Sequence, residues 1–153
     1  MTPPGRRAMS GSGSVVVLAP QAAVWAALQD PDVLVALIPG ADTVTRLDSG
    51  RFRAMMSFGV GRMRSLMAVE LSVSGEPPGA LTLEGHSVGG LGGGRAAGIV
   101  TLTERRPGRT VVEWSFEGEV SGPVSFAGDM LLQMSARLFT GRFFAALTRQ
   151  AFP

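Results

Sequence analysis

The chain has 153 residues, of which 45% are hydrophobic and 17% are charged, and this suits one domain built around one core. Its formal net charge is only +2 and its arginines are scattered, so the clustered basic face of a nucleic-acid-binding protein is excluded. The absence of cysteine excludes disulfides, thiol chemistry and cysteine-ligated zinc.

The apolar stretches of the chain are short. None reaches the roughly 18 residues that a membrane-spanning helix requires. The apolar run that follows Arg6 and Arg7 is shorter than the hydrophobic region of an export signal, and no cleavage site comes after it. We therefore predict a cytoplasmic protein.

The N-terminal segment is rich in proline, glycine and serine, so we expect residues 1–12 to be disordered. Residues 13–153 are then expected to form a single domain. Its first element is a strand over residues 14–19, where valines and a leucine follow one another.

Two short helices are predicted after this strand. Pro20 fits the first turn of one helix. Asp30 caps the next helix, and Pro31 occupies its first helical position. The pair Pro39-Gly40 ends it, because the residue before a proline is disfavoured in a helix and glycine permits the exit turn.

From residue 42 onward, apolar and polar residues alternate with the period of a strand. Short turn-like segments rich in glycine separate the alternating stretches, which predicts an antiparallel meander. The predicted strands are 42–48, 51–59, 63–73, 80–88, 95–105 and 109–120. A helical pattern then returns from about Val124 to Gln150.

One face of the predicted sheet is almost wholly apolar. In the last strand, Val112, Trp114 and Phe116 share a face, whereas Glu113 and Glu117 lie on the other. An apolar sheet face must be covered, and the C-terminal helix is the natural cover. Its expected apolar side consists of Met130, Leu131, Met134, Leu138, Phe143, Phe144 and Leu147. The predicted fold is α+β, with a curved antiparallel sheet of about seven strands around a long C-terminal helix and two short helices between strands 1 and 2.

Catalytic chemistry finds little support in the sequence. The single histidine, His86, falls on the polar face of its strand beside Glu84. Glu113, Glu117 and Glu119 share the solvent face of one strand, and no nucleophile motif such as G-x-S-x-G occurs. One histidine without cysteine disfavours a transition-metal site. We predict no catalytic residue and no metal.

The glycine run "GGLGGG" at residues 89–94 invites comparison with phosphate-binding loops. It lacks the P-loop lysine, and indeed the chain contains no lysine. It also lies between antiparallel strands rather than between a strand and a helix. We predict a flexible hairpin loop, and a role at the rim of a pocket stays open.

The stretch "APQAAVWAALQDPDVLVALIPGAD" resembles the signature of the CoxG family of carbon monoxide dehydrogenase subunits, which belongs to the START-like (SRPBCC) superfamily with its helix-grip fold. The matching positions are Pro20, Val24, Trp25, Leu28, Asp30, Pro31, Leu34, Ile38, Pro39 and Gly40. Weaker matches follow at "GVG" (59–61), the glycine-rich segment 89–98 and "FF" (143–144), so the resemblance covers about residues 10–150.

This resemblance implies a non-catalytic accessory protein. Such a protein would hold a lipophilic molecule, for example a long-tailed respiratory quinone or another lipid, without a covalent bond. It would couple a molybdenum hydroxylase of the CO dehydrogenase type to the inner face of the cytoplasmic membrane. Two alternatives stay open: an enzyme of the same fold, of the cyclase or hydrolase type, and an assembly or docking factor that binds no ligand.

The apolar face predicts where a ligand would bind. Methionine is flexible and frequent at accommodating surfaces, although ordinary core packing is the alternative explanation for it. The predicted ligand-binding residues are Leu34, Leu37, Ile38, Phe52, Met56, Phe58, Met67, Leu71, Leu83, Trp114, Phe116, Met130, Met134 and Leu138. Of these, Leu34, Leu37 and Ile38 are candidates for the mouth of the pocket.

Magnitudes favour a ligand with a long tail. Burying roughly 300 Å² of a small ring gains about 7 kcal/mol at ~25 cal/mol/Å². Association costs at least about 4 kcal/mol, so such a ring would bind weakly. A tail that raises the buried area to roughly 600 Å² gains about 15 kcal/mol. An apolar cavity with few polar groups therefore favours isoprenoid quinones or acyl lipids over compact polar metabolites.

The C-terminal segment also permits a membrane interpretation. Arg137, Arg142 and Arg149 punctuate its apolar residues, as in an interfacial helix. Because the same helix must cover the sheet, we favour the covering role and keep peripheral membrane contact as an alternative.

Overall fold

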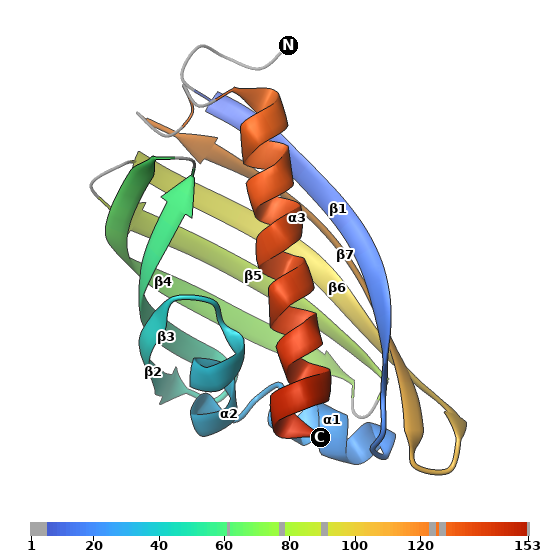
Figure 1. Ribbon diagram of the computed structural model, residues 1–153. Coiled ribbons are helices and arrows are strands. Elements are labelled where there is room, and N and C mark those ends of the chain that lie inside the picture. Colours follow the sequence, from blue (N-terminus) through green and yellow to red (C-terminus); the bar gives the residue numbers. More distant parts are fainter. Residues whose placement is uncertain are drawn as a thin grey trace.

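In the computed structural model, a seven-stranded antiparallel sheet curves around a long C-terminal helix (Figure 1). The structure describes residues 6–60, 62–76, 79–89, 92–122, 125 and 128–152. The elements in chain order are β1 (Arg6–Val17), α1 (Gln21–Ala27), α2 (Pro31–Leu37), β2 (Ala41–Asp48), β3 (Arg51–Val60), β4 (Met63–Glu76), β5 (Ala80–Gly89), β6 (Gly92–Arg106), β7 (Arg109–Ser121), α3 (Asp129–Ala146) and the π-helical turn η2 (Leu147–Ala151). The predicted α+β helix-grip fold is confirmed.

The strand order β1-β7-β6-β5-β4-β3-β2 follows from a simple meander. Strands β2 to β7 pair with their chain neighbours, and β1 then pairs with β7 over its whole length, from Arg6 opposite Ser121 to Val17 opposite Thr110. The first and last strands of the chain therefore lie side by side at one edge of the sheet. Helix α3 lies across the concave face on this side, and α1 and α2 lie at one end (Figure 1).

The second short helix begins and ends where the sequence predicts. The Asp30 side chain accepts a hydrogen bond from the backbone N–H of Asp32 at 2.9 Å, which confirms the N-cap. After α2, Gly40 has φ +78°, and a Cβ there would lie 2.3 Å from the carbonyl oxygen of Ser57. Only glycine fits this exit, because both the backbone conformation and the close approach to β3 exclude a side chain.

The main core lies at the end of the sheet where the helices converge. Its most deeply buried side chains come from every layer of the fold. They include Val17, Val24, Leu34, Leu37, Phe52, Leu81, Val112 and Leu147, each at most 2% exposed. The short helices are thus stabilised by burial in this core rather than by their own backbone hydrogen bonds.

Two predicted strand starts are wrong by three residues or more. The first strand begins at Arg6 instead of residue 14, so residues 6–12, expected to be disordered, form more than half of β1. The cause is long-range pairing with β7, which composition does not reveal. Strand β6 begins at Gly92 instead of residue 95, so part of the glycine run is a strand. The predicted helix start near Val124 lies outside the described residues.

Two glycines of β1 make room for aromatic rings of β7. A Cβ at Gly13 would lie 2.3 Å from the Trp114 ring, and one at Gly11 would lie 2.6 Å from the Phe116 ring. On its other side, Trp114 stacks on Phe144 of α3, with ring centroids 4.0 Å apart and an interplanar angle of 11°. Strand, ring and helix are therefore packed in one continuous stack.

In the described part of the chain, no helix combines the length and the apolar character needed to cross a bilayer.

We expect Gly13→Val to destabilise the protein by about 1–3 kcal/mol, because the new side chain must displace Trp114 from its stack with Phe144. The free energy of unfolding from urea titration measures this. The matched control is Ser14→Val, which places the same side chain on the exposed face of the same strand and should change stability by less than about 0.5 kcal/mol. Equal effects from both variants would contradict the packing described.

Candidate functional site

A cavity of about 380 Å³ lies between α3 and the concave face of the sheet. Most of the predicted ligand-binding residues line it. These are Leu34, Ile38, Met56, Met67, Leu71, Leu83, Trp114 and Phe116. They come from α2 and from strands β3, β4, β5 and β7, and the two-residue alternation of each strand places them on the inner face as predicted.

The floor of the cavity is a patch of sheet without large side chains. Gly85, Ala96 and Gly118 lie directly opposite one another on β5, β6 and β7. Gly94 and Gly98 extend the patch along the inner face of β6. Three neighbouring strands thus present almost bare backbone to α3, and the missing side-chain volume is what creates the cavity. We call these five residues the small-residue floor.

Helix α3 forms the roof. The roof residues follow one another every three or four positions along one side of the helix. They are Leu132, Ser135, Ala136, Phe139, Thr140, Phe143 and Phe144. Leu132 is 1% exposed and Phe144 packs in the core, so this side of the helix is buried against the sheet.

The sequence assigned the wrong side of α3 to the ligand. Met130, Met134 and Leu138 are 79%, 61% and 54% exposed and face away from the sheet. Apolar residues occur all around the first half of this helix, so periodicity alone leaves its rotation undetermined. The rotation is set instead by tertiary contacts. The Phe144 ring stacks on Trp114, and the Gln133 side chain pairs with β1.

Two other predicted residues do not line the cavity. Leu37 and Phe52, at 2% and 1% exposed, are ordinary core residues beside it. Phe58 lies in β3, but its side chain is outside the described residues. Ligand binding by the remaining predicted residues stays a prediction.

Sequence reasoning missed the small-residue floor and most of the roof. Gly85, Gly98 and Gly118 fall inside predicted strands and Gly94 falls in the predicted loop, so the patch is recognisable only when the strands are aligned by register. In the pairing observed, positions 85, 96 and 118 fall in one row across the sheet. Predicted strand limits alone were too imprecise to place these residues opposite one another.

The cavity offers little chemistry beyond apolar contact. Among its described lining residues, Ser87, Ser135 and Thr140 supply hydroxyl groups on the inner side. His86, Arg95 and Glu119 also belong to the lining, but the two-residue alternation of their strands turns these side chains to the outer face. The Thr140 hydroxyl lies 3.2 Å from the carbonyl oxygens of both Ala136 and Arg137, to which it can donate within its own helix. General acid–base catalysis needs a titratable group aimed at the substrate.

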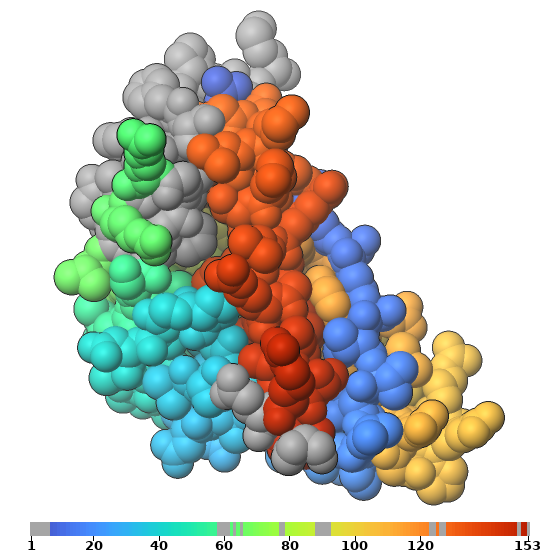
Figure 2. Space-filling model, in the orientation of Figure 1, coloured from blue at the N-terminus to red at the C-terminus, as the bar shows by residue number. Residues whose placement is uncertain are grey.

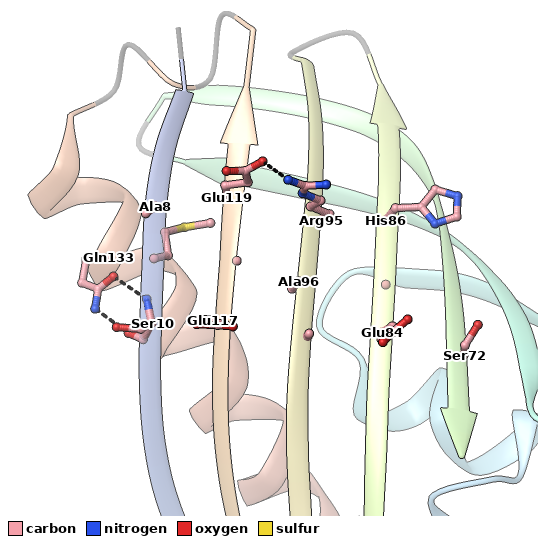
Figure 3. A pocket seen from close by; sticks show the side chains of 14 residues that line it. Ala8, Ser10, Ser72, Glu84, His86, Arg95, Ala96, Glu117, Glu119 and Gln133 are labelled. Atoms are coloured by element: carbon pink, nitrogen blue, oxygen red, sulfur yellow. Dashed lines mark hydrogen bonds and ion pairs between the residues drawn. The ribbon is translucent and has the colours of Figure 1, made fainter. Parts of the chain in front are cut away.

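The charged side chains of the same strands project from the outer face (Figure 3). There they line a broad depression of about 720 Å³. Arg95 pairs with Glu119 at 2.8 Å, and His86 lies 3.5 Å from Glu70. Among the described residues, no group of three histidine, aspartate or glutamate side chains is placed to hold a metal ion. As predicted, His86 and the glutamates lie on the solvent side of the sheet.

A carboxyl group on this outer face is electrostatically perturbed. The pKa of Glu70 lies below its ordinary value of 4.5, chiefly because Arg53 donates a hydrogen bond to it at 2.8 Å. The positive charges of Arg53, His86 and Arg51 add to the effect, and partial desolvation opposes it. The charges of Arg53 and Glu70 thus compensate each other across β3 and β4.

We expect Arg53→Gln to raise the pKa of Glu70, which an NMR titration of the carboxyl carbon would measure. Because the folded pKa is the lower one, the stability linked to Glu70 is present above the unfolded value near 4.5 and is lost as the pH falls through the folded pKa. The Arg53→Gln variant should therefore lack the part of the folding stability that depends on the lowered pKa of Glu70. Arg105→Gln, an exposed change elsewhere, should leave the titration of Glu70 unaltered.

Comparison with known proteins gives one family and many structures. Residues 13–152 match the family model of the carbon monoxide dehydrogenase subunit named CoxG. No curated protein matches the chain significantly. A conserved protein from Geobacillus kaustophilus has a similar structure, with a TM-score of 0.85 and 24% identity over 93% of this chain and 94% of that one.

Two further solved structures have the same fold at lower identity. The Zhui aromatase/cyclase from Streptomyces sp. R1128 gives a TM-score of 0.71 and 14% identity, over 95% of this chain and 94% of that one. A START superfamily protein from Mycobacterium smegmatis gives 0.69 and 14%, over 92% and 95%. Such identities show the START-like fold and carry no activity with them.

Proposed function

We propose, from the premise that the chain belongs to the CoxG family of carbon monoxide dehydrogenase subunits, that it is an accessory protein that binds a lipophilic molecule beneath α3. The apolar cavity over the small-residue floor carries this proposal. Protein interiors are normally close-packed, and an apolar void forfeits the contacts that its walls would otherwise make. An apolar ligand would restore those contacts.

The ligand class follows from what the walls can offer. The cavity lies within the usual size range of ligand pockets, roughly 300–1,000 Å³. Because its walls supply mainly apolar surface, affinity must come from buried area. By the area argument above, a compact ring alone binds weakly, whereas a long hydrocarbon tail adds several kcal/mol. A respiratory quinone with an isoprenoid tail satisfies this requirement.

The family description supports a partner enzyme. We propose that the protein serves a molybdenum hydroxylase of the CO dehydrogenase type and couples it to the inner face of the cytoplasmic membrane. In this role the bound quinone would accept electrons at the enzyme, and the carrier itself needs no catalytic group.

An enzyme of the same fold is the second candidate. A structural neighbour is named as an aromatase/cyclase, so the fold is compatible with this alternative. A cyclase must place acid or base groups against its substrate. In this chain the inward hydroxyls of Ser135 and Thr140 would have to serve, because the carboxylates and His86 shown in Figure 3 lie on the outer face, where they line the depression described above.

We expect organic extraction of the purified protein, followed by mass spectrometry, to release a long-tailed lipid in near-stoichiometric amount. In titrations, a quinone with an isoprenoid tail should bind at least about a hundredfold more tightly than the same ring without the tail, because the tail adds buried apolar area. Equal affinity for both, together with an empty extract, would favour a docking factor without ligand.

A matched pair of variants tests the site itself. Ala96→Leu fills the small-residue floor and should weaken binding of the tailed quinone by at least about tenfold. Ala97→Leu adds the same side chain at the next position, on the outer face, and should leave binding unchanged. Thermal unfolding of both variants serves as the folding control. If Ala96→Leu folds and binds normally, the cavity is not the binding site.

A further inference from the structure

The side of α3 that faces away from the sheet carries a row of exposed apolar side chains. Met130, Met134 and Leu138 are spaced four residues apart and are 79%, 61% and 54% exposed. The row is about 12 Å long at 1.5 Å per residue. We call these three residues the outer stripe. Figure 2 shows α3, in orange and red, running along the front of the molecule without another element over it.

Arginines flank the outer stripe on both sides. At about 100° per residue, Arg137 falls beside one margin of the stripe and Arg142 beside the other. Both are exposed. Neither has an ion-pair partner among the described residues, since the ion pairs there involve other side chains. The single acidic residue of the C-terminal segment, Asp129, pairs with Arg7 at 3.4 Å.

These charges argue against a second copy of the chain as the partner. Two copies meeting stripe to stripe would bring Arg137 and Arg142 of one copy against those of the other, with no carboxylate between them. A protein partner is disfavoured by size. A stable protein interface involves roughly 20–30 residues on each side, whereas the outer stripe is one short helical face.

An anionic bilayer surface fits both properties. Helices that lie at the membrane interface combine a few large apolar side chains with flanking basic residues. The apolar side chains enter the boundary between headgroups and acyl chains, and the arginines reach the lipid phosphates. Neither contact requires a large complementary surface.

We propose that the outer stripe, with Arg137 and Arg142, is the surface by which this protein contacts membranes that contain anionic lipids. The stripe lies about 180° around α3 from the cavity roof at Leu132, Ala136 and Phe139. A single helix therefore presents one side to the bilayer and the other to the ligand. This proposal rests on the membrane coupling of the proposed function and deepens it by naming the surface that makes the contact and the class of lipid that it meets.

Vesicle flotation tests the proposal with the full chain. Vesicles of phosphatidylcholine mixed with phosphatidylglycerol should bind the protein, and vesicles of phosphatidylcholine alone should bind it much less. Raising the salt concentration should weaken binding, because exposed charges are screened. Arg142→Gln should lower the partition coefficient about fivefold, the factor that corresponds to about 1 kcal/mol for one basic residue near an anionic surface.

The apolar part is tested by Met134→Gln combined with Leu138→Gln, which should weaken partitioning by at least about tenfold. Ile99→Gln is the matched control, because Ile99 is 53% exposed and lies on the outer sheet face, away from α3. It should leave partitioning unchanged. Circular dichroism and thermal unfolding show whether each variant is folded, and exposed positions of this kind tolerate the change.

Three results would overturn the proposal. The wild-type protein could fail to bind anionic vesicles, or the stripe variants could bind them as well as Ile99→Gln does. The stripe variants could also keep vesicle binding and lose capture of the partner oxidoreductase, which would make this face a protein interface. Quinone titration of the same variants distinguishes this proposal from the proposed function. Variants that lose vesicle binding but bind quinone normally support a membrane role for the outer stripe and leave the cavity unaffected. Variants that bind vesicles normally but lose quinone binding would instead connect these residues with the cavity.

Discussion

The seating of α3 along β1 and β7 determines the rest of this structure. At the C-terminal half of the helix, Phe144 stacks on Trp114, and the Trp114 ring lies over Gly13. At the N-terminal half, the amide of Gln133 pairs with the backbone of Ser10, accepting from its N–H at 3.0 Å and donating to its carbonyl oxygen. A side-chain amide thus continues the sheet's hydrogen bonding at the exposed edge of β1. These contacts fix both the position of the helix and its rotation.

The cavity is a consequence of this seating. Held along β1 and β7, the helix spans the rows in which β5, β6 and β7 carry glycine and alanine. Met9 on β1 and Leu71 on β4 stand at the two ends of the row formed by Gly85, Ala96 and Gly118, and both line the cavity. The outer face of the same strands differs in chemistry, because its charged residues pair with one another, as Arg95 does with Glu119. A sheet with one compensated polar face and one partly bare apolar face is suited to binding hydrophobic molecules.

The rotation of α3 also assigns the two proposed roles to opposite sides of one helix. Leu132 and Phe139 belong to the side that roofs the cavity, and Met134 and Leu138 belong to the opposite side. Because hydrophobic burial is non-directional, the inner side restricts the class of ligand without selecting one molecule. On the outer side the arginines add electrostatic preference, which is why we assign that side to an anionic surface. Both roles are possible because the sheet covers only one side of α3, so that the opposite side stays exposed to solvent.

The sequence by itself determined the features that depend only on residues close together in the chain. The Asp30 cap, the exit at Gly40 and the two-residue alternation of β7 all depend on neighbours in the chain, and each was predictable. The family motif added the helix-grip fold. Tertiary structure alone decided the extension of β1 to Arg6, the small-residue floor and the rotation of α3. Each of these depends on residues far apart in sequence: strand register aligns Gly85, Ala96 and Gly118, and the contacts of Phe144 and Gln133 choose one side of a helix whose apolar residues point in several directions.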